Sequence, residues 1–435
     1  MSAMNSGTQT APPNLEDKIN EAYSARARTE RDDELTAYSN KVAKAFGYTE
    51  DELRAIPEGS NIGLSCGNPV AAANIKLGEV VVDLGSGGGI DVFLAADKVG
   101  PNGRVVGLDG SQDMIDLARK NAAQKGLKPP QVAFVQASLT EPLPLESNSV
   151  DCILSNCVLN LLPFDGKARL LKETFRVLKP GGRIVLDDII AKKELPDTIK
   201  SDVSSYIGCV AGAITLGEYE KLLIGAGFRN SLLVATKNDL GVYFESVRQG
   251  TGCCSSLSPP SLIGKPSYDI NEWVASYQIY AAKGEDQPVE RIPSETLLRW
   301  FDAYPKAKST PEVLTDEEVA TLIRNQGLPD KSSTDYVVID VRGDDHAGGH
   351  VRGSDNWPAK PFYDDLPQFY EKYQNTPQVI FYCNRSNGRG PRSAAWYQDY
   401  VDAHGGKNSK AYVLKGGIKN WLEKYEGQED LVDHE

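Results

Sequence analysis

The most constraining feature of this chain is a glycine-rich loop that separates a short apolar run from a helical segment. In VVVDLGSGGGIDVFLAA, Asp83 is followed by Gly85, Ser86, Gly87 and Gly89. Glycines in such a loop let the backbone turn sharply and approach a ligand where a side chain would collide. Short apolar runs alternate with helical segments after this loop, which is typical of a doubly wound parallel sheet. The sequence therefore predicts an α/β fold with a ligand-binding loop after its first strand.

The alternation continues over much of the chain. Leu15–Phe46 has the charged, alanine-containing pattern of amphipathic helices, and Ser111–Lys125 and Lys167–Leu178 are also predicted to be helical. LLVATKND and WVASYQIYAAK are two further strands that could close the edge of the sheet. The central strands are predicted at Glu79–Leu84, Arg104–Asp109, Val132–Gln136, Cys152–Ser155 and Arg183–Asp188.

The length of 435 residues favours more than one domain. Apolar periodicity gives way to charge and proline in KGEDQPVERIPS, so we place a boundary near Lys283–Ser294. Beyond it a smaller α/β unit is expected. Its helices are predicted at Thr296–Tyr304, Thr315–Asn325, Pro391–His404 and Ile418–Lys424, and its strands at Tyr336–Val341, Gln378–Tyr382 and Ala411–Leu414. The predicted organisation is a disordered N-terminus (1–14), a first domain with a helical N-terminal cap (15–284), a linker and helix (285–310) and a second domain (311–435).

Composition excludes several classes of partner. A formal net charge of -13 argues against binding to nucleic acid or to an anionic membrane surface. No segment is apolar for long enough to span a membrane, and the N-terminus does not resemble a signal peptide. Seven cysteines, an odd number, fit reduced thiols better than a disulfide framework. We therefore expect a cytoplasmic protein whose thiols are free to bind soft ions or to act as nucleophiles.

Two acidic residues indicate which ligand the glycine loop binds. Asp83 precedes the glycines, where dinucleotide-binding proteins keep an apolar residue because a diphosphate would be repelled. Asp109 ends the second strand, where a carboxylate can accept hydrogen bonds from both ribose hydroxyls. LLKETFRVLKPGGRIVLDD adds the helix, turn and strand typical of the class I methyltransferase fold. These features predict S-adenosylmethionine as cofactor. The assigned contacts are Asp83, Gly85, Ser86, Gly87, Gly89, Asp109, Gly110, Ser138, Leu139 and Asn156.

Three cysteine-containing motifs narrow the choice of methyl acceptor. NIGLSCGNPV, LSNCVLNLLP and YIGCVAGAI resemble motifs of the arsenite methyltransferase family, and the similarity runs from about Glu16 to Lys283. The resemblance implies that Cys66, Cys157 and Cys209 bind trivalent arsenic, a soft ion that prefers thiolates. It also implies that methylation proceeds by positioning the arsenic lone pair opposite the sulfonium methyl group. The family's reductant would be glutathione or thioredoxin.

The remaining cysteines of this region are less informative. Many family members carry a further cysteine in the N-terminal helical region, but none precedes Cys66 here, so a redox step there is in doubt. Cys152 lies inside a predicted strand and matches no family motif, which indicates a core residue. Cys253 and Cys254 form a vicinal pair in a Gly/Ser-rich loop. They could deliver arsenite to the site or have no fixed role.

The second domain contains its own cysteine motif. In VIFYCNRSNGRGPRSAAWYQDY, five residues separate Cys383 from Arg389 before a predicted helix. Such a loop aims backbone N–H groups at a tetrahedral oxyanion, with the arginine as a bidentate clamp. With YVVIDVRGDDHAGGHVRGSDNWPA it resembles the rhodanese fold, and the GPR that contains Arg392 resembles yeast-type arsenate reductases and cell-cycle dual-specificity phosphatases. That resemblance implies reduction of arsenate by Cys383 and glutathione or glutaredoxin.

One departure concerns this second motif. Tyr382 stands where that subgroup usually has histidine. The alternative that this domain binds its anion but has lost catalytic activity therefore stays open. His346 and His350 have the spacing of a metal pair, but His350 is more typical of a structural hydrogen-bonding residue, and no third ligand is nearby. The leading hypothesis is an enzyme that reduces arsenate in one domain and methylates arsenite in the other. The alternatives are a methyltransferase for another thiophilic substrate with a phosphatase or sulfurtransferase domain, and a second domain that only docks a thiol protein or regulates the first.

Overall fold

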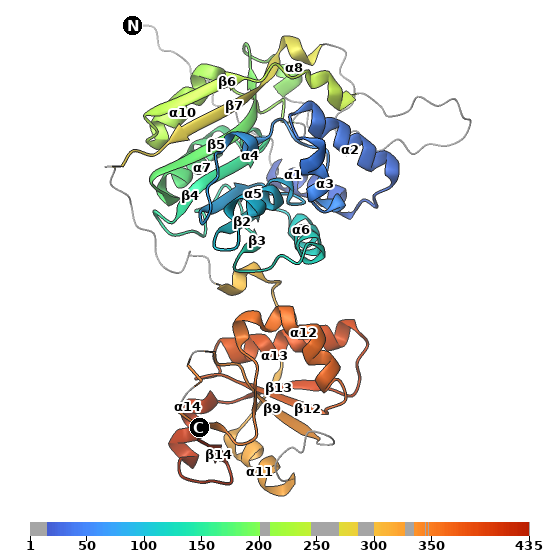
Figure 1. Ribbon diagram of the computed structural model, residues 1–435, viewed down its shortest axis with the longest axis vertical. Helices are drawn as coiled ribbons and strands as arrows, with labels where there is room; N and C mark the ends of the chain where they lie inside the picture. Colours follow the sequence, from blue (N-terminus) through green and yellow to red (C-terminus); the bar gives the residue numbers. More distant parts are fainter. Residues whose placement is uncertain are drawn as a thin grey trace, which may run out of the picture. The chain divides into compact units, whose positions relative to one another are not determined.

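The computed structural model describes residues 15–200, 209–244, 269–285, 300–326, 335–343, 345–346 and 348–434. Its contacts divide the chain into two compact units, Met1–Arg299 (unit 1) and Trp300–Glu435 (unit 2) (Figure 1). The vicinal pair Cys253 and Cys254 lies outside the described residues, as does most of the predicted boundary segment Lys283–Ser294. Within the described part of the chain, no helix is both long enough and apolar enough to cross a bilayer.

Unit 1 is built on a seven-stranded mixed sheet of order β3-β2-β1-β4-β5-β7-β6. The pairs from β3 to β5 are parallel, whereas β7 runs antiparallel to both β5 and β6. The predicted class I methyltransferase fold is therefore confirmed, with the two predicted additional strands as β7 and, at the edge, β6. The strands are β1 (Val80–Leu84), β2 (Arg104–Asp109), β3 (Val132–Gln136), β4 (Val150–Asn156), β5 (Leu178–Ala191), β6 (Asn230–Ala235) and β7 (Val274–Ala282).

Both faces of this sheet are buried. Along β1, Val82 and Leu84 belong to one apolar cluster and Val81 to another, because successive side chains of a strand point to opposite faces. The N-terminus of helix α6 is capped by the Ser111 side chain, which accepts a hydrogen bond from the backbone N–H of Met114. Helix α4 (Pro69–Ala72) precedes β1. The helices that follow strands of the sheet are α5 (Ile90–Val99), α6 (Gln112–Gln124), α7 (Phe164–Val177), α8 (Asp197–Lys200) and α10 (Leu216–Ala226).

Three N-terminal helices cover the carboxyl ends of the central strands. They are α1 (Leu15–Arg28), α2 (Asp33–Ala45) and α3 (Glu50–Ala55), drawn in blue in Figure 1. Contacts with helices α5 and α6 place this region. Ser24 Oγ of α1 lies 2.8 Å from Oγ of Ser111, the N-cap residue of α6. The hydroxyl of Tyr48, between α2 and α3, donates to Asp91 Oδ1 of α5 at 2.7 Å. Thr49 and Glu52 form a capping box that fixes the start of α3. The helical N-terminal region predicted from the sequence is therefore present, and residues of α1 lie across from the glycine loop.

Unit 2 contains a five-stranded parallel sheet of order β11-β9-β12-β13-β8. Of the predicted helix Thr296–Tyr304, the described part forms only a short 3-10 turn, Trp300–Ala303, because Pro305 disfavours helical backbone at the residue before it. Helix α12 was missed in the sequence, since Pro367 interrupts its pattern. The elements are β8 (Glu312–Leu314), α11 (Asp316–Gln326), β9 (Tyr336–Asp340), β10 (His350–Val351), β11 (Asp355–Asn356), α12 (Ala359–Tyr373), β12 (Gln378–Tyr382), α13 (Arg389–Ala403), β13 (Lys410–Leu414), α14 (Gly417–Tyr425) and β14 (Val432–Asp433).

Candidate functional site

Unit 1 has a cavity of about 470 Å³ at the carboxyl ends of β1, β2 and β4. This is where open α/β sheets bind their ligands. All but one of the residues assigned to the cofactor from the sequence line it; the exception is Gly89, the N-cap residue of helix α5, with a φ of 97°. The assigned residues in the lining are Asp83, Gly85, Ser86, Gly87, Asp109, Gly110, Ser138, Leu139 and Asn156.

The glycine loop is held by backbone hydrogen bonds that require its glycines. Gly85 has a φ of 71° and donates its N–H to the Leu108 carbonyl at 2.7 Å. A Cβ on Gly85 would lie 2.3 Å from a Val158 methyl group, and one on Gly88 would lie 2.7 Å from the Ser60 carbonyl. Positions 85 and 88 therefore have room only for glycine, as the sequence predicts for a backbone that approaches a ligand.

Asp109 organises the same loop from the end of β2. Its Oδ2 accepts a hydrogen bond from Gly87 N and its Oδ1 one from Ser111 N, both at 2.9 Å. Burial raises the pKa of this carboxyl, and the two backbone donors oppose that shift. Each oxygen keeps a further lone pair that can accept from a ligand hydroxyl. The carboxylate is thus fixed in orientation before any ligand binds.

The cavity is electrostatically negative. Asp83, Asp91 and Asp109 line it, and among its described lining residues there is no lysine or arginine. Burial is the main cause that raises the pKa of all three carboxyls. The pKa of Asp91 rises to about 6. The pKa of Asp83 is raised further by the neighbouring acids Asp91 and Asp109. A site of this kind favours a cationic ligand, because a cation relieves the mutual repulsion of the carboxylates.

Asn156, at the end of β4, connects this cavity to the first cysteine. Its Oδ1 accepts from the Cys66 backbone N–H at 2.9 Å, and its Nδ2 donates to the Gly67 carbonyl and to the Tyr48 hydroxyl, each at 2.9 Å. Asp91 Oδ2 lies 3.3 Å from the same Nδ2. One amide side chain therefore contacts the cavity wall and fixes the backbone on both sides of the Cys66–Gly67 peptide bond.

The three cysteines predicted to bind arsenic come together beside the cavity. Cys66 and Cys157 form a disulfide with a Cα–Cα distance of 5.9 Å, and the Cys209 thiol donates to the Cys157 carbonyl at 2.8 Å. The expectation that the thiols are all reduced is therefore wrong for this pair, because two cysteines at this spacing are within reach of a disulfide. All three are buried, Cys157 lines the cavity, and burial raises the pKa of the Cys209 thiol.

The backbone at two of these cysteines is in an unusual conformation. Cys157 has a φ of 60° and Cys209 a φ of 64°, in the left-handed region that residues other than Gly, Asn and Asp rarely adopt. Such strain persists only where the surroundings impose it, and it is frequent at functional sites. Cys152, by contrast, lies in β4 in the apolar core, where burial raises the pKa of its thiol to about 12.

Unit 2 places Cys383 at the end of β12 and Arg389 at the start of α13, in a pocket of about 400 Å³. Cys383 is buried, and the pocket is also lined by Arg385 and Arg392. Arg392 stacks on the Phe301 ring with its guanidinium carbon 3.3 Å from the ring centre. Three arginines around a cysteine at a helix N-terminus favour an anion.

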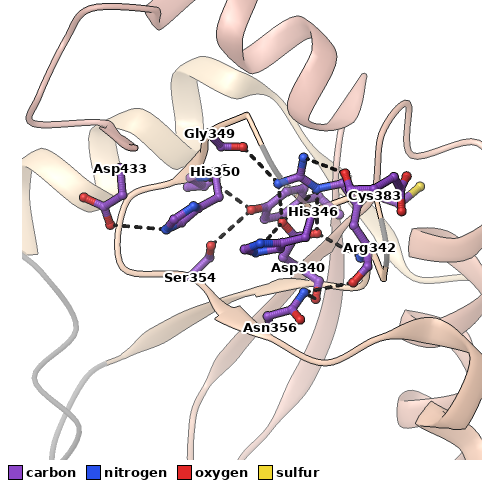
Figure 2. Close-up of polar contacts among 12 residues, drawn as sticks. Asp340, Arg342, His346, Gly349, His350, Ser354, Asn356, Cys383 and Asp433 are labelled. Carbon is purple, nitrogen blue, oxygen red and sulfur yellow. Dashed lines mark hydrogen bonds and ion pairs between the residues drawn. The ribbon is translucent and has the colours of Figure 1, made fainter. Parts of the chain in front are cut away.

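A polar network formed by buried side chains lies close to Cys383 (Figure 2). Arg342 donates through Nε to Asp340 Oδ1 at 3.0 Å and through Nη2 to Asp340 Oδ2 at 2.6 Å. Tyr382, next to Cys383, accepts from Val351 N at 3.2 Å and lies 3.1 Å from Ser354 Oγ. The tyrosine that replaces the expected histidine is therefore engaged with the β10 segment.

The two histidines of unit 2 belong to the same region. His346 and His350 stack with ring centres 5.2 Å apart. His346 Nε2 lies 3.5 Å from Asp340 Oδ2, and His350 Nε2 lies 3.8 Å from Asp433 Oδ2 (Figure 2). Among the residues that the structure describes, no cluster of three or more His, Cys, Asp or Glu is arranged to hold a metal ion. The histidine pair contacts carboxylates of its own unit.

Comparisons with known proteins match a different part of the chain to each of two domain families. Residues 75–241 match the model of a methyltransferase domain, and residues 322–424 that of a rhodanese-like domain. An arsenite methyltransferase from Halobacterium salinarum is 41% identical over 197 residues, which cover 45% of this chain and 49% of that protein. The chain thus contains a methyltransferase domain related to the arsenite methyltransferases. The match spans about half the length of that relative.

Solved structures resemble each domain separately. The crystal structure of an arsenic(III) S-adenosylmethionine methyltransferase from Chlamydomonas reinhardtii shares 26% identity at a TM-score of 0.40, covering 57% of this chain and 75% of that one. A yeast protein tyrosine phosphatase of the rhodanese family shares 23% identity at a TM-score of 0.26, covering 29% of this chain and 94% of that one.

Sequence reasoning missed two acids of the methyltransferase domain that lie beside its cysteines. The Asp187 carbonyl accepts from Cys157 N at 2.9 Å and lies 3.2 Å from Cys66 Sγ. Burial is the main cause that raises the pKa of Asp187 to about 8 and that of Asp188 to about 7. Both residues are in the LDD segment of β5, so two consecutive acids inside an apolar strand were the available signal.

Proposed function

We propose that the methyltransferase domain transfers a methyl group from S-adenosylmethionine to trivalent arsenic held by Cys66, Cys157 and Cys209. The observation that carries this proposal is the meeting of three cysteines, from segments far apart in the sequence, beside an acid-lined cavity. The relation to arsenite methyltransferases supports the choice of acceptor.

The cavity suits the cofactor in charge and in shape. S-adenosylmethionine supplies a methyl group on a positively charged sulfonium. Asp83 and Asp91 would face its cationic portion, while Asp109, already oriented by two backbone donors, would accept from the ribose hydroxyls. Gly85 and Gly88 leave the backbone close to the bound molecule, where a Cβ would collide with neighbouring atoms.

The cysteines would bind arsenic only in their reduced form. Two electrons and two protons convert the Cys66–Cys157 disulfide into two thiols, which with Cys209 provide three sulfur ligands. Each thiol that replaces a hydroxyl of arsenous acid releases one water, and three Sγ–As bonds leave the arsenic lone pair exposed. A thiol reductant, glutathione or thioredoxin, is therefore part of the proposed reaction.

We also propose that the rhodanese-like domain reduces arsenate. Cys383 would attack arsenic with loss of water, and Arg389 and the loop N–H groups would hold the oxyanion. A glutathione or glutaredoxin thiol would then attack Cys383 Sγ, forming a disulfide and leaving arsenic two electrons richer, as arsenite. The same arginines and loop N–H groups would suit a phosphate ester, so a phosphatase is the second candidate; the yeast relative of this fold is described as a tyrosine phosphatase.

The first proposal is tested by methyl transfer from labelled S-adenosylmethionine to arsenite with glutathione present. Cys157→Ser and Cys209→Ser should abolish transfer while S-adenosylhomocysteine binding, measured by calorimetry, stays intact. Cys152→Ser is the matched control, because this cysteine is buried in β4 away from the site. Unchanged turnover in the first two variants would refute the ligand assignment.

The second proposal has an independent test. Cys383→Ser should remove arsenate reduction and leave arsenite methylation unchanged, with arsenic species separated by chromatography. Reduction that persists in this variant would show that another site is responsible. Release of phosphate from an aryl phosphate, lost in Cys383→Ser while arsenate is not reduced by the wild type, would favour the phosphatase candidate.

A further inference from the structure

The Arg389 guanidinium in the anion pocket of unit 2 is already bound to a carboxylate. Arg389 Nη1 donates to Asp345 Oδ1 at 2.7 Å, and Nη2 donates to Asp345 Oδ2. This is the parallel two-bond geometry that arginine uses for carboxylates and tetrahedral oxyanions. An oxyanion bound by the Cys383 loop would need the same two N–H groups.

The position of Asp345 is set by the turn that carries it. Gly343 N donates to Asp345 Oδ1 at 3.2 Å, and His346 N donates to the Gly343 carbonyl at 3.0 Å. The Asp345 carbonyl accepts from Arg342 Nη1 at 3.3 Å. Arg342 is itself fixed by its buried pair with Asp340, whose side chain is fully buried. The carboxylate is therefore presented by a turn that rests on a rigid pair.

The charge of Asp345 is present over the whole physiological range. Arg389 lowers the pKa of its carboxyl to about 2, so the carboxylate is ionised at any pH where the protein would be assayed. The side chains of Asp345 and Arg389 are 40% and 32% exposed, so water and salt screen their attraction. An exposed pair of this kind is weak enough for an incoming anion to displace.

We propose that Asp345 is a specificity-determining residue of the anion pocket, whose carboxylate competes with the incoming oxyanion for Arg389. The pocket then retains only anions that bind the guanidinium and the loop N–H groups more strongly than an internal carboxylate binds the guanidinium alone. The doubly charged tetrahedral oxyanions arsenate and phosphate meet that condition through their additional oxygens, whereas acetate does not. The inference rests on the proposed anion binding at this loop and not on what happens to the anion afterwards.

The experiment measures protection of Cys383 from alkylation by iodoacetamide in the full chain. Arsenate, phosphate and acetate are titrated separately, and the rate at the Cys383 peptide is followed by mass spectrometry. Asp345→Asn should lower the half-protecting concentration of arsenate and phosphate by about two- to fivefold, the range of exposed ion pairs. It should also allow acetate to protect. Asp345→Glu, which keeps the carboxylate, should stay close to the wild type.

Glu312→Gln is the matched control, because it removes one negative charge from the same unit, where Glu312 pairs with Lys410 on the surface. Equal tightening in Glu312→Gln and Asp345→Asn would overturn the proposal, since net charge would then explain the effect. Unchanged protection in Asp345→Asn, or no protection by any oxyanion in any variant, would overturn it as well. Tighter arsenate binding without arsenate reduction would instead refute the reductase function and leave the role of Asp345 supported.

Discussion

Asp187 offers the sharpest test of the electrostatics beside the cysteines. Its side chain is 1% exposed, and its Oδ1 lies 3.4 Å from Gln278 Nε2. Among the described residues, none donates a hydrogen bond to its Oδ2. The carboxyl group packs against Gly67, where a Cβ would lie 2.1 Å from Asp187 Cγ. Burial therefore penalises its charged form, and replacement by the neutral isostere asparagine should remove that penalty.

The size of the effect follows from the pKa. The carboxyl has a pKa of about 8 in the folded protein against a reference value of 3.8. An acid whose pKa is raised on folding loses stability as pH increases, from the unfolded pKa up to the folded one. At about 1.4 kcal/mol per pKa unit, this cost grows by about 3 to 4 kcal/mol between pH 5 and pH 8. Asp187→Asn should not show that increment.

Thermal unfolding of unit 1 at pH 5 and pH 8, followed by circular dichroism, measures this difference. The Tm of Asp187→Asn minus the Tm of the wild type should be about 6 to 8 °C larger at pH 8 than at pH 5. This follows from a Tm change of roughly 2 °C per kcal/mol. Asp165→Asn, an exposed acid of the same unit with 73% of its side chain accessible, is the control and should run parallel to the wild type. Parallel curves for Asp187→Asn would refute the assignment of a buried, protonated carboxyl at neutral pH.

Two other predictions concern the loop and the buried ion pair. Gly85→Ala should weaken S-adenosylhomocysteine binding at least about tenfold by calorimetry, because its φ is 71° and its Cβ would clash. Gly181→Ala has a similar φ of 77° but free space around it, so binding that falls equally in both variants would contradict the steric explanation. Arg342→Ala leaves Asp340 buried without its partner and should destabilise unit 2 by about 3–5 kcal/mol in denaturant unfolding. Removing the exposed Arg324 should cost about 1 kcal/mol or less, and a similar loss in both would contradict the role of burial.

The parts of the fold that were predictable are those in which local chemistry and tertiary structure agree. The apolar run before Asp83 and the capping Ser111 define a strand and a helix from nearest neighbours alone. Because the carboxyl ends of parallel strands share one edge, Asp83, Asp109 and Asn156 could be placed together without coordinates. Helix α12 could not be predicted, since Pro367 breaks its local pattern and the helix packs against α13, which lies far along the sequence.

The missed parts of the site depend on contacts between distant segments. Tyr48 donates to Asp91, 43 positions away, and nothing near either residue indicates the partner. The Cys66–Cys157 disulfide joins residues 91 positions apart, and spacing alone does not reveal which thiols are paired. Asp345 reaches Arg389 across 44 positions of sequence. Each of these contacts is created by the tertiary fold, which brings distant segments together.

The arrangement of the three cysteines makes the proposed substrate a cross-link of the protein that acts on it. An arsenic atom on Cys66, Cys157 and Cys209 would close one loop across a separation of 91 residues and a second across 52. Closing loops of this length removes conformational freedom mainly from the unfolded chain, as a disulfide does. The methyltransferase domain would therefore be hardest to unfold while it holds arsenic. Each product release would return the domain to its less stable, arsenic-free form. The stability of the domain against unfolding would therefore depend on the concentration of its own substrate.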